Sequence, residues 1–187
     1  MRYRKKRNEV QPRLEINFTP MVAKLPLLYV INSNEVLLRK ENCDIIHKTG
    51  ALHRAIHILV VNSKGDIFVR KRSTKKKLYP EVWSTSVGAH ILEDDTPEIT
   101  AETNLTKFLG LQLPLTPIGE CRVKDDIENE LMYVYVCHAQ TIDELNPEES
   151  DEGKFMSLTT IREMIRKNET TPHLTASCDL LERYISS

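Results

Sequence analysis

The fold is decided by two neighbouring segments, Ala55-Ile-His-Ile-Leu-Val-Val61 and Ile67-Phe-Val-Arg-Lys-Arg72. Both are rich in β-branched and apolar residues, and the turn sequence Lys64-Gly65-Asp66 lies between them. The pattern predicts two strands joined by a tight turn. Residues 25–31 and 35–39 flank another turn at 32–34 and predict a second hairpin. Residues 119–123 and 131–137 supply two more strands.

Helical signals follow the strands. In residues 96–109, Thr96 is a candidate N-cap, Pro97 stands at the first helical position and Gly110 follows the last turn. Its apolar residues fall mostly on one face, as in a helix that packs on a sheet. Residues 159–167 and 176–185 predict two further helices. This order indicates an α/β protein with a mixed sheet covered by helices.

Composition excludes several classes of protein. The chain has 187 residues, 40% of them hydrophobic, with 26 Lys+Arg against 27 Asp+Glu. This suits one globular domain, and the net charge of −1 gives no field for holding nucleic acid. No segment approaches the roughly 18 apolar residues of a membrane span. The four separated cysteines lack a CxxC pair and a preceding secretory signal, which indicates reduced thiols in the cytoplasm: Cys43, Cys121, Cys137 and Cys178.

The N-terminal residues differ from the rest of the chain. Residues 1–13 are rich in Lys and Arg and contain almost nothing apolar, so they cannot contribute to a core by themselves. We expect residues 1–24 to form a flexible basic tail and residues 25–187 to form the domain. A basic tail can also touch nucleic acid or membrane, but Glu9 and Glu15 dilute its charge. The oligomeric state is left open.

One set of candidate site residues combines histidines with glutamates. Imidazole nitrogens and carboxylate oxygens make a plausible site for Mg²⁺, Mn²⁺ or Zn²⁺. Glu128 and Glu130 stand two apart at a strand entrance, so they share a face and repel unless a cation or proton lies between them. Taken one by one, histidines are more often ordinary core or surface residues, and the glutamates could be edge-strand charges. The set is His47, His53, His90, Glu128 and Glu130.

A second set is cationic. Residues 70–77 carry six positive charges in Arg-Lys-Arg-Ser-Thr-Lys-Lys-Lys. In a nearly neutral protein such a loop attracts anions, and arginine grips phosphate oxygens with two hydrogen bonds. A solvated run of charges explains the same residues.

In combination, several segments resemble the Nudix superfamily, and within it the branch that contains isopentenyl-diphosphate isomerase and its hydrolase relatives. The resemblance spans roughly residues 25–185 and implies a Nudix-type α/β/α sandwich around a mixed β-sheet. Its motifs are Leu52–His57, Gly65–Arg72, Tyr79–Trp83, Ser86–His90, Glu128–Leu131 and Asn146–Glu149.

The resemblance implies roles for particular residues. The isomerases of that branch hold a divalent metal with three histidines and two glutamates, which correspond here to the set already chosen. Arg72 and Lys76 fall where relatives bind the substrate diphosphate. Glu149 matches an acidic residue before the last strand of the sheet, where it could act as a base, although a loop acid needs no function.

Two departures from the family pattern restrict the chemistry. The catalytic cysteine of the isomerases would stand at Gly88, so isomerisation by that mechanism is disfavoured. The Nudix box aligns so that its helix glutamates are missing, and Lys107 stands where a cation should bind. Loss of those carboxylates removes most of the electrostatic catalysis of a standard Nudix hydrolase. The aligned helix residues are Thr103, Asn104, Leu105, Thr106, Lys107 and Phe108.

Three functional hypotheses follow. The first is a protein that binds a diphosphate-containing small molecule and a divalent metal, Mg²⁺ or Mn²⁺ before Zn²⁺. Weak or altered diphosphate hydrolysis would then use Glu130 as the preferred carboxylate and Glu149 as a base. The second is a catalytically inactive Nudix domain that senses a ligand or binds a protein. The third, isopentenyl-diphosphate isomerisation, is disfavoured by Gly88.

Overall fold

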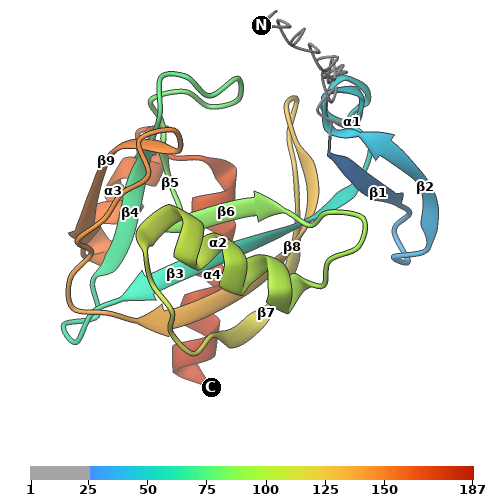
Figure 1. The fold of residues 1–187 in the computed structure, drawn as a ribbon. Helices are drawn as coiled ribbons and strands as arrows, with labels where there is room; N and C mark the ends of the chain where they lie inside the picture. Colours follow the sequence, from blue (N-terminus) through green and yellow to red (C-terminus); the bar gives the residue numbers. More distant parts are fainter. Residues whose placement is uncertain (1–25) are drawn as a thin grey trace, which may run out of the picture.

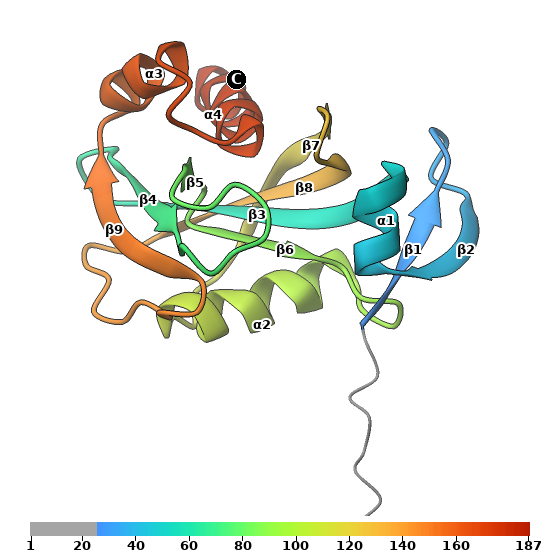
Figure 2. The same ribbon diagram turned by 90° about the horizontal axis from the view of Figure 1, so that it is seen from above.

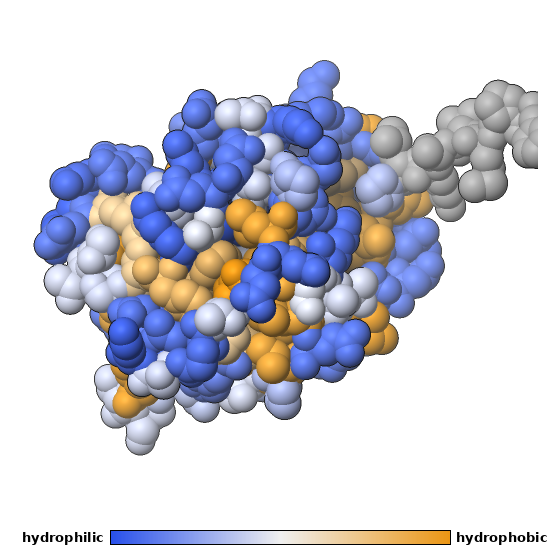
Figure 3. Space-filling view, turned by 60° about the vertical axis from the view of Figure 1, so that its left-hand side comes forward, coloured by the Kyte–Doolittle hydropathy of each residue, from blue (hydrophilic) through white to orange (hydrophobic). Residues whose placement is uncertain are grey.

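The computed structural model of the chain describes residues 26–187. The predicted basic tail, residues 1–24, lies outside the described residues. In the described part, no helix is both long enough and apolar enough to cross a membrane. On the face shown in Figure 3, hydrophilic residues cover much of the surface and hydrophobic ones gather toward its centre.

Strand β3 (His53–Val61) is the centre of the sheet (Figure 1). Strand β8 (Asn129–His138) runs parallel to it along one edge over its whole length. Three antiparallel strands follow one another along the other edge, and they are β1 (Leu27–Ile31), β6 (Val87–His90) and β4 (Ile67–Arg72). Because β6 and β4 pair with different halves of β3, the sheet divides between them.

The remaining strands extend this mixed sheet. They are β2 (Leu37–Asn42) beside β1, β7 (Thr116–Lys124) beside β8, and β5 (Trp83–Ser84) and β9 (Ser150–Met156) beside β4. All four pairings are antiparallel. The two predicted hairpins are confirmed by β1–β2 and β3–β4, and the two later predicted strands by β7 and β8.

Helices cover both faces of the sheet (Figure 2). Helix α2 (Pro97–Leu109) lies on one face, while α3 (Leu158–Arg166) and α4 (Pro172–Ser186) lie on the other. The short helix α1 (Cys43–Thr49) follows β2. This three-layer arrangement confirms the predicted α/β class.

Helix α2 begins and ends as its sequence predicts. The Thr96 hydroxyl accepts a hydrogen bond from the Ile99 amide at 3.3 Å, and Pro97 occupies the first turn. The helix ends at Gly110, whose φ of +66° is the left-handed conformation that glycine adopts without strain.

Alternation along β3 divides the core into two layers. Ile56, Ile58 and Val60 pack under α2, whereas Leu59 and Val61 pack under α3 and α4. Strand alternation therefore sends the odd-numbered residues of β3 to the α4 side of the sheet. This parity decides where the two histidines of β3 lie.

Other elements differ from the sequence prediction. Helix α1 and strands β5, β6 and β9 were not predicted, and α4 begins at Pro172 rather than at residue 176. The first turn of α4 has a threonine N-cap followed by proline, as α2 does, and the Thr171 hydroxyl accepts from the Leu174 amide. The predicted start followed the apolar residues of the helix and so missed the capping signal.

Candidate metal centre

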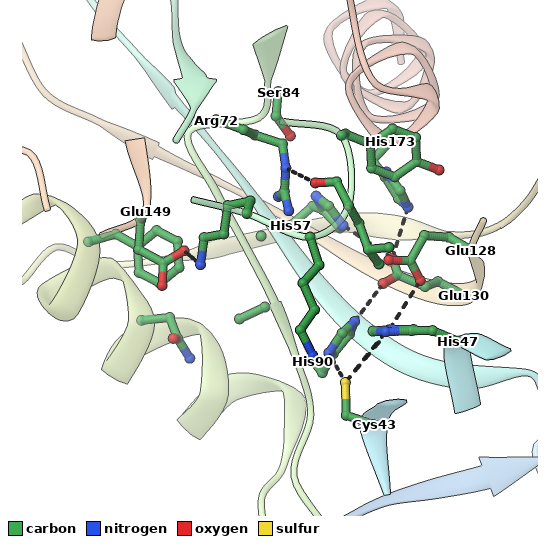
Figure 4. A pocket seen from close by; sticks show the side chains of 18 of the residues that line it. Cys43, His47, His57, Arg72, Ser84, His90, Glu128, Glu130, Glu149 and His173 are labelled. Atoms are coloured by element: carbon green, nitrogen blue, oxygen red, sulfur yellow. Dashed lines mark hydrogen bonds and ion pairs between the residues drawn. The ribbon is translucent and has the colours of Figure 1, made fainter. Parts of the chain in front are cut away.

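Five of the six histidines of the chain gather with two glutamates at one end of β3 and β8 (Figure 4). His53 and His57 are four residues apart on β3 and therefore share the face that looks toward α4. On the neighbouring strand β6, His90 pairs with Ala55 in the register of the sheet. The sheet thus supplies three of the five imidazoles.

Two helices supply the remaining imidazoles. His47 lies in the last turn of α1, which Asn42 caps by accepting a hydrogen bond from the Asp44 amide at 2.8 Å. His173 is the second residue of α4, directly after Pro172. The N-cap at Thr171 therefore determines where the His173 ring enters the cluster.

The two glutamates come from the start of β8. Glu130 pairs in register with His53 of β3, and Glu128 directly precedes the strand. The Asp125 carboxylate accepts hydrogen bonds from the Ile127 and Glu128 amides at 2.8 Å and so fixes this turn. The exposed fractions are only 6% for Glu128 and 4% for Glu130, so both carboxylates have left bulk water.

The cluster contains two groups with the geometry of metal ligands. We call His47, His53, His90 and Glu128 the outer group, and His57, Glu130 and His173 the inner group; within each, the ligand atoms lie within 4.8 Å of one another. The outer group contains four of the five predicted metal ligands. The fifth, Glu130, adjoins it, because its Oε1 lies 3.1 Å from Nε2 of His90 and 3.6 Å from Nε2 of His53.

Within the outer group, Oε2 of Glu128 lies 3.5 Å from Nε2 of His47 and 3.9 Å from Nε2 of His53. Two of these buried atoms, Nε2 of His53 and Oε2 of Glu128, have no hydrogen-bond partner among the described residues. Unpaired buried polar atoms are costly, so their convergence fits a bound cation.

Burial and mutual repulsion perturb the two carboxylates in opposite directions. Burial, and then the charge of Glu130, raise the pKa of Glu128 to about 7. Burial acts on Glu130 in the same way, but contacts with four imidazoles outweigh it and hold the pKa of Glu130 well below its ordinary value. The cluster therefore keeps one carboxylate ionised, and ionisation of the other is costly when no cation is bound.

The histidines respond to the same two causes. Burial lowers the pKa of His47 and of His57 to about 4. Burial also lowers the pKa of His53 and of His173, but contact with Glu130 outweighs it, so the net shift of both is upward.

The cluster opens into a pocket of about 380 Å³, which is within the range of small-molecule sites. Because the sheet divides between β4 and β6, residues from both helical layers line it. They include His173 of α4 and, from α2, Asn104, Lys107 and Phe108. The end of β4 and the loop that follows it form another side and supply Arg72, Lys76 and Lys77.

Both predicted phosphate ligands therefore line the same pocket as the cluster. The Nε of Arg72 donates to the Leu78 carbonyl at 3.0 Å, which holds the loop back against the strand. Nζ of Lys76 lies 2.5 Å from the Glu149 carboxylate. The predicted base Glu149 is thus an ion-pair partner of Lys76, and Figure 4 shows it across the pocket from Glu130.

Gly88 explains how β3 accommodates His57. The two residues pair in register, and a Cβ at position 88 would lie 2.8 Å from Cε1 of the His57 ring. The imidazole of His57 therefore occupies the space beside the position where the resemblance places a catalytic cysteine. A thiol does line the pocket, but it is Cys43, whose Sγ lies 3.5 Å from Nδ1 of His90. Burial raises the pKa of that thiol to about 11.

Two histidines of the cluster were missed from the sequence. His57 could have been found by alternation, since it follows His53 by four residues on a strand that was predicted. His173 lay before the predicted start of its helix, and only the Thr-Pro capping signal could have placed it on α4. Neither belongs to the five-residue set that the family resemblance implies.

The mixed sheet between two helical layers is the fold of a known family of domains. The family model of the NUDIX domain matches residues 51–177, and the chain belongs to this family. The predicted Nudix-type sandwich is thereby confirmed.

Relatives with similar sequences fall in two groups. Isopentenyl-diphosphate Delta-isomerase 1 of Photorhabdus laumondii is 29% identical over 125 residues, which cover 63% of this chain and 71% of the relative. An uncharacterized Nudix hydrolase of Listeria monocytogenes is 30% identical over 88 residues, which cover 42% of this chain and 52% of that protein. The chain is related to both isomerases and Nudix hydrolases.

Solved structures share the fold at lower sequence identity. DR0079 of Deinococcus radiodurans has a TM-score of 0.66 at 18% identity and covers 78% of this chain and 91% of its own. The NUDIX domain of Shewanella oneidensis NrtR, solved with ADP ribose, has a TM-score of 0.56 at 15% identity and covers 71% of this chain and 86% of its own.

Proposed function

We propose that the protein binds a diphosphate-containing small molecule between a divalent cation held by the outer group and the cationic loop, and that it hydrolyses the diphosphate. The observation that carries the proposal is a single pocket lined by both the histidine–glutamate cluster and Arg72, Lys76 and Lys107. Diphosphate oxygens need positive charge on more than one side, and this pocket offers it.

The residues present fit a divalent cation. His47, His53, His90, Glu128 and Glu130 would hold it, and the unpaired buried atoms of His53 and Glu128 are its strongest support. Three imidazoles favour Mn²⁺ or Zn²⁺ over Mg²⁺, which prefers oxygen ligands. A bound cation would polarise a phosphoryl oxygen and offset the charge that develops during cleavage.

The chain's own residues would bind and orient the substrate. Arg72 reaches the pocket from the end of β4 and Lys76 from the loop that follows it. Lys107 reaches it from α2, where an exposed ammonium replaces a carboxylate of the Nudix box. In hydrolysis, water adds to phosphorus, the bridging P–O bond breaks, and the leaving phosphate keeps the electron pair. Glu149 is the candidate acceptor of the water proton, while Glu130 is the preferred carboxylate beside the cation.

Two related proteins guide the choice of substrate. The NrtR domain was solved with ADP ribose, and the isomerase relatives are named for isopentenyl diphosphate. The pocket volume of about 380 Å³ accommodates the diphosphate with part of either molecule. A small-molecule diphosphate is therefore the proposed partner, and the cytoplasm is the proposed location.

The test is cleavage by full-length protein that has been stripped of metal and reloaded with Mn²⁺. ADP ribose and isopentenyl diphosphate are supplied, and products are followed by phosphorus NMR. We expect cleavage that a chelator abolishes and that Glu130→Gln reduces at least about 100-fold, while Glu120→Gln, at an exposed position of β7, leaves it unchanged.

The same experiment decides between the alternatives. Metal-independent binding without cleavage would overturn hydrolysis and favour an inactive domain that senses its ligand, as the missing box glutamates suggest. Formation of dimethylallyl diphosphate would instead revive isomerisation, which would then have to proceed without a thiol at position 88.

A further inference from the structure

The three residues of the inner group point toward a common centre. A single cation in the outer group would contact only Glu130 among them and would leave His57 and His173 without a metal to bind. All three residues are almost fully buried, with exposed fractions of 6% for His57, 4% for Glu130 and 5% for His173. The two imidazole rings stack with their centroids 5.0 Å apart and 7° between their planes. The Nε2 atoms of His57 and His173 lie 3.5 and 3.1 Å from the same oxygen, Oε2 of Glu130.

Glu130 divides its two oxygens between the groups. Oε1 faces His53 and His90 of the outer group, and Oε2 faces His57 and His173. Each oxygen therefore contacts imidazole nitrogens of a different group. A carboxylate in this position can bridge two cations, as carboxylates do in two-metal sites.

Hydrogen bonds fix the ring proton of His57 on the side away from Glu130. The Thr85 hydroxyl donates to the Val87 carbonyl at 3.0 Å, so it accepts from Nδ1 of His57 at 2.9 Å. The neutral ring then presents the Nε2 lone pair to an ionised oxygen of Glu130. Two electron-rich atoms face each other in a buried space, and a cation between them removes the repulsion.

His53 of the outer group is arranged in the same way. Its Nδ1 donates to the Ala51 carbonyl at 3.0 Å, which leaves Nε2 facing the two glutamates. The two histidines of β3 therefore have matching ring orientations, one for each oxygen of Glu130.

His173 gives independent support. Its Nε2 is buried and has no hydrogen-bond partner among the described residues, although Oε2 of Glu130 is 3.1 Å away. Contact at this distance without hydrogen-bond geometry leaves a polar nitrogen unsatisfied in the interior, where that is costly. A ligand bound at the centre of the inner group would satisfy it.

We propose that His57, Glu130 and His173 hold a second divalent cation, and that Glu130 bridges it to the cation of the outer group. The inference rests on the proposed function, which assigns the first cation. Two imidazoles and a carboxylate favour Zn²⁺ or Mn²⁺. All three residues line the pocket, so a cation there has an open side toward substrate or water.

The second site requires a residue without a side chain at position 88. The close approach of position 88 to the His57 ring means that even a methyl group must displace the imidazole. Gly88→Ala therefore disturbs the inner group without changing any ligand, and it complements direct replacement of His173.

The test measures metal stoichiometry of the full-length, metal-stripped protein with Mn²⁺ and with Zn²⁺, by calorimetry and by metal analysis after equilibrium dialysis. We expect two ions per chain in the native protein. His173→Gln and Gly88→Ala should each retain one ion, as should His47→Gln through loss of the outer ion. The matched control is His138→Gln, at the exposed end of β8, which should retain two.

Electron paramagnetic resonance of the Mn²⁺-loaded native protein is a second readout that needs no variant. Two bridged ions should give a spin-coupled spectrum, and His173→Gln should give the spectrum of an isolated ion. If His173→Gln fails to fold, as judged by circular dichroism, native stoichiometry and coupling decide the question.

The outcomes separate the two proposals. One ion per chain in the native protein, unaffected by His173→Gln, would overturn the second site and leave the proposed function standing. A native stoichiometry of one ion per chain, with that ion lost on replacement of either His47 or His173, would indicate a single shared cation and also overturn the second site. Two uncoupled ions would remove the bridging role of Glu130. Binding of no ion would reject both proposals.

Discussion

Two walls of the same pocket, one built from strands and one from a helix, carry opposite chemistry. The strand wall on β3, β6 and β8 contributes imidazoles and the buried carboxylate of Glu130. The helix wall consists of Asn104, Lys107 and Phe108 of α2 and contains no carboxylate. In the family pattern that the sequence resembles, this helix supplies metal-binding glutamates, whereas in this chain α2 contributes none of the candidate ligands. They come from β3, β6, the start of β8, α1 and α4.

The comparison shows that the fold and the chemistry of α2 depend on different residues. Leu105, Phe108 and Leu109 are buried against the sheet, whereas Lys107 is exposed to the pocket. Residues on the exposed face of α2 can therefore be replaced by residues of another charge, because the apolar residues of its buried face hold the helix on the sheet. The predictions that follow test this separation, beginning with the largest expected effect.

Glu130→Gln should abolish most of the metal binding by the strand wall. Replacement of the carboxylate by a neutral amide takes away the charge that faces both groups, so affinity for Mn²⁺ should fall at least about 1000-fold, or about 4 kcal/mol. Calorimetric titration of the metal-stripped protein measures it, with Glu120→Gln as the exposed control. Undiminished Mn²⁺ affinity would show that Glu130 is not a ligand.

Leu105→Ala should affect stability alone. The side chain is 1% exposed and packs between α2 and the sheet. Its truncation should lower the free energy of unfolding by about 3 kcal/mol, measured by urea denaturation. Mn²⁺ affinity of the folded variant should stay within about twofold of the native value, because the helix contributes none of the proposed ligands. A large loss of affinity would mean that the two walls are coupled.

Much of the strand wall could be predicted because alternation along a strand has a fixed period. The sequence predicts Glu128 and Glu130 on one face, and in the structure their carboxylates lie 3.9 and 3.6 Å from the same atom, Nε2 of His53. The same rule would have added His57 to His53. Local patterns could not supply the contact of α4 with the sheet, which brings His173 into the cluster. His47 was in the predicted set, but the helix α1 that carries it was not predicted.

The fold was predicted most accurately where capping and apolar periodicity agree, as they do in α2. Strand β9 was missed because Ser150-Asp-Glu-Gly-Lys-Phe-Met156 is mostly polar, and its pairing with β4 rather than its own sequence makes it a strand. The two-residue strand β5 is likewise defined by its partner β4. The divided sheet that opens the pocket therefore could not be predicted from local patterns.

Glu128→Gln should change how the stability of the metal-free protein depends on pH. The pKa of Glu128 is raised to about 7 from an ordinary value near 4.5. Its contribution to the free energy of unfolding is therefore fully present below about pH 4.5 and is lost as the pH rises through 7. The neutral variant lacks this loss of stability, so its free energy of unfolding at pH 8 should exceed that of the native protein by about 3 kcal/mol.

Urea denaturation at pH 5 and pH 8, in the presence of a chelator, measures this difference, with Glu152→Gln at an exposed position of β9 as the control. Glu128→Gln should also bind Mn²⁺ more weakly, because Glu128 is a proposed metal ligand although it lowers stability when no metal is bound. If the free energies of unfolding of the native and variant proteins changed with pH in the same way, the raised pKa of Glu128 would be contradicted.

Lys107→Ala should have the smallest effect and tests the helix wall directly. Lys107 is exposed and forms no ion pair with another residue of 26–187, so its ammonium is free to contact an anion in the pocket. Its loss should weaken binding of ADP ribose about fivefold at low salt and less at high salt.

The substitution Lys107→Glu tests the same wall more sharply. If the helix wall has exchanged metal binding for direct phosphate binding, a restored carboxylate should weaken ligand binding further than alanine does, and metal stoichiometry should not rise. Stronger ligand binding by Lys107→Glu in the presence of Mn²⁺ would show instead that α2 has kept the ability to hold a cation.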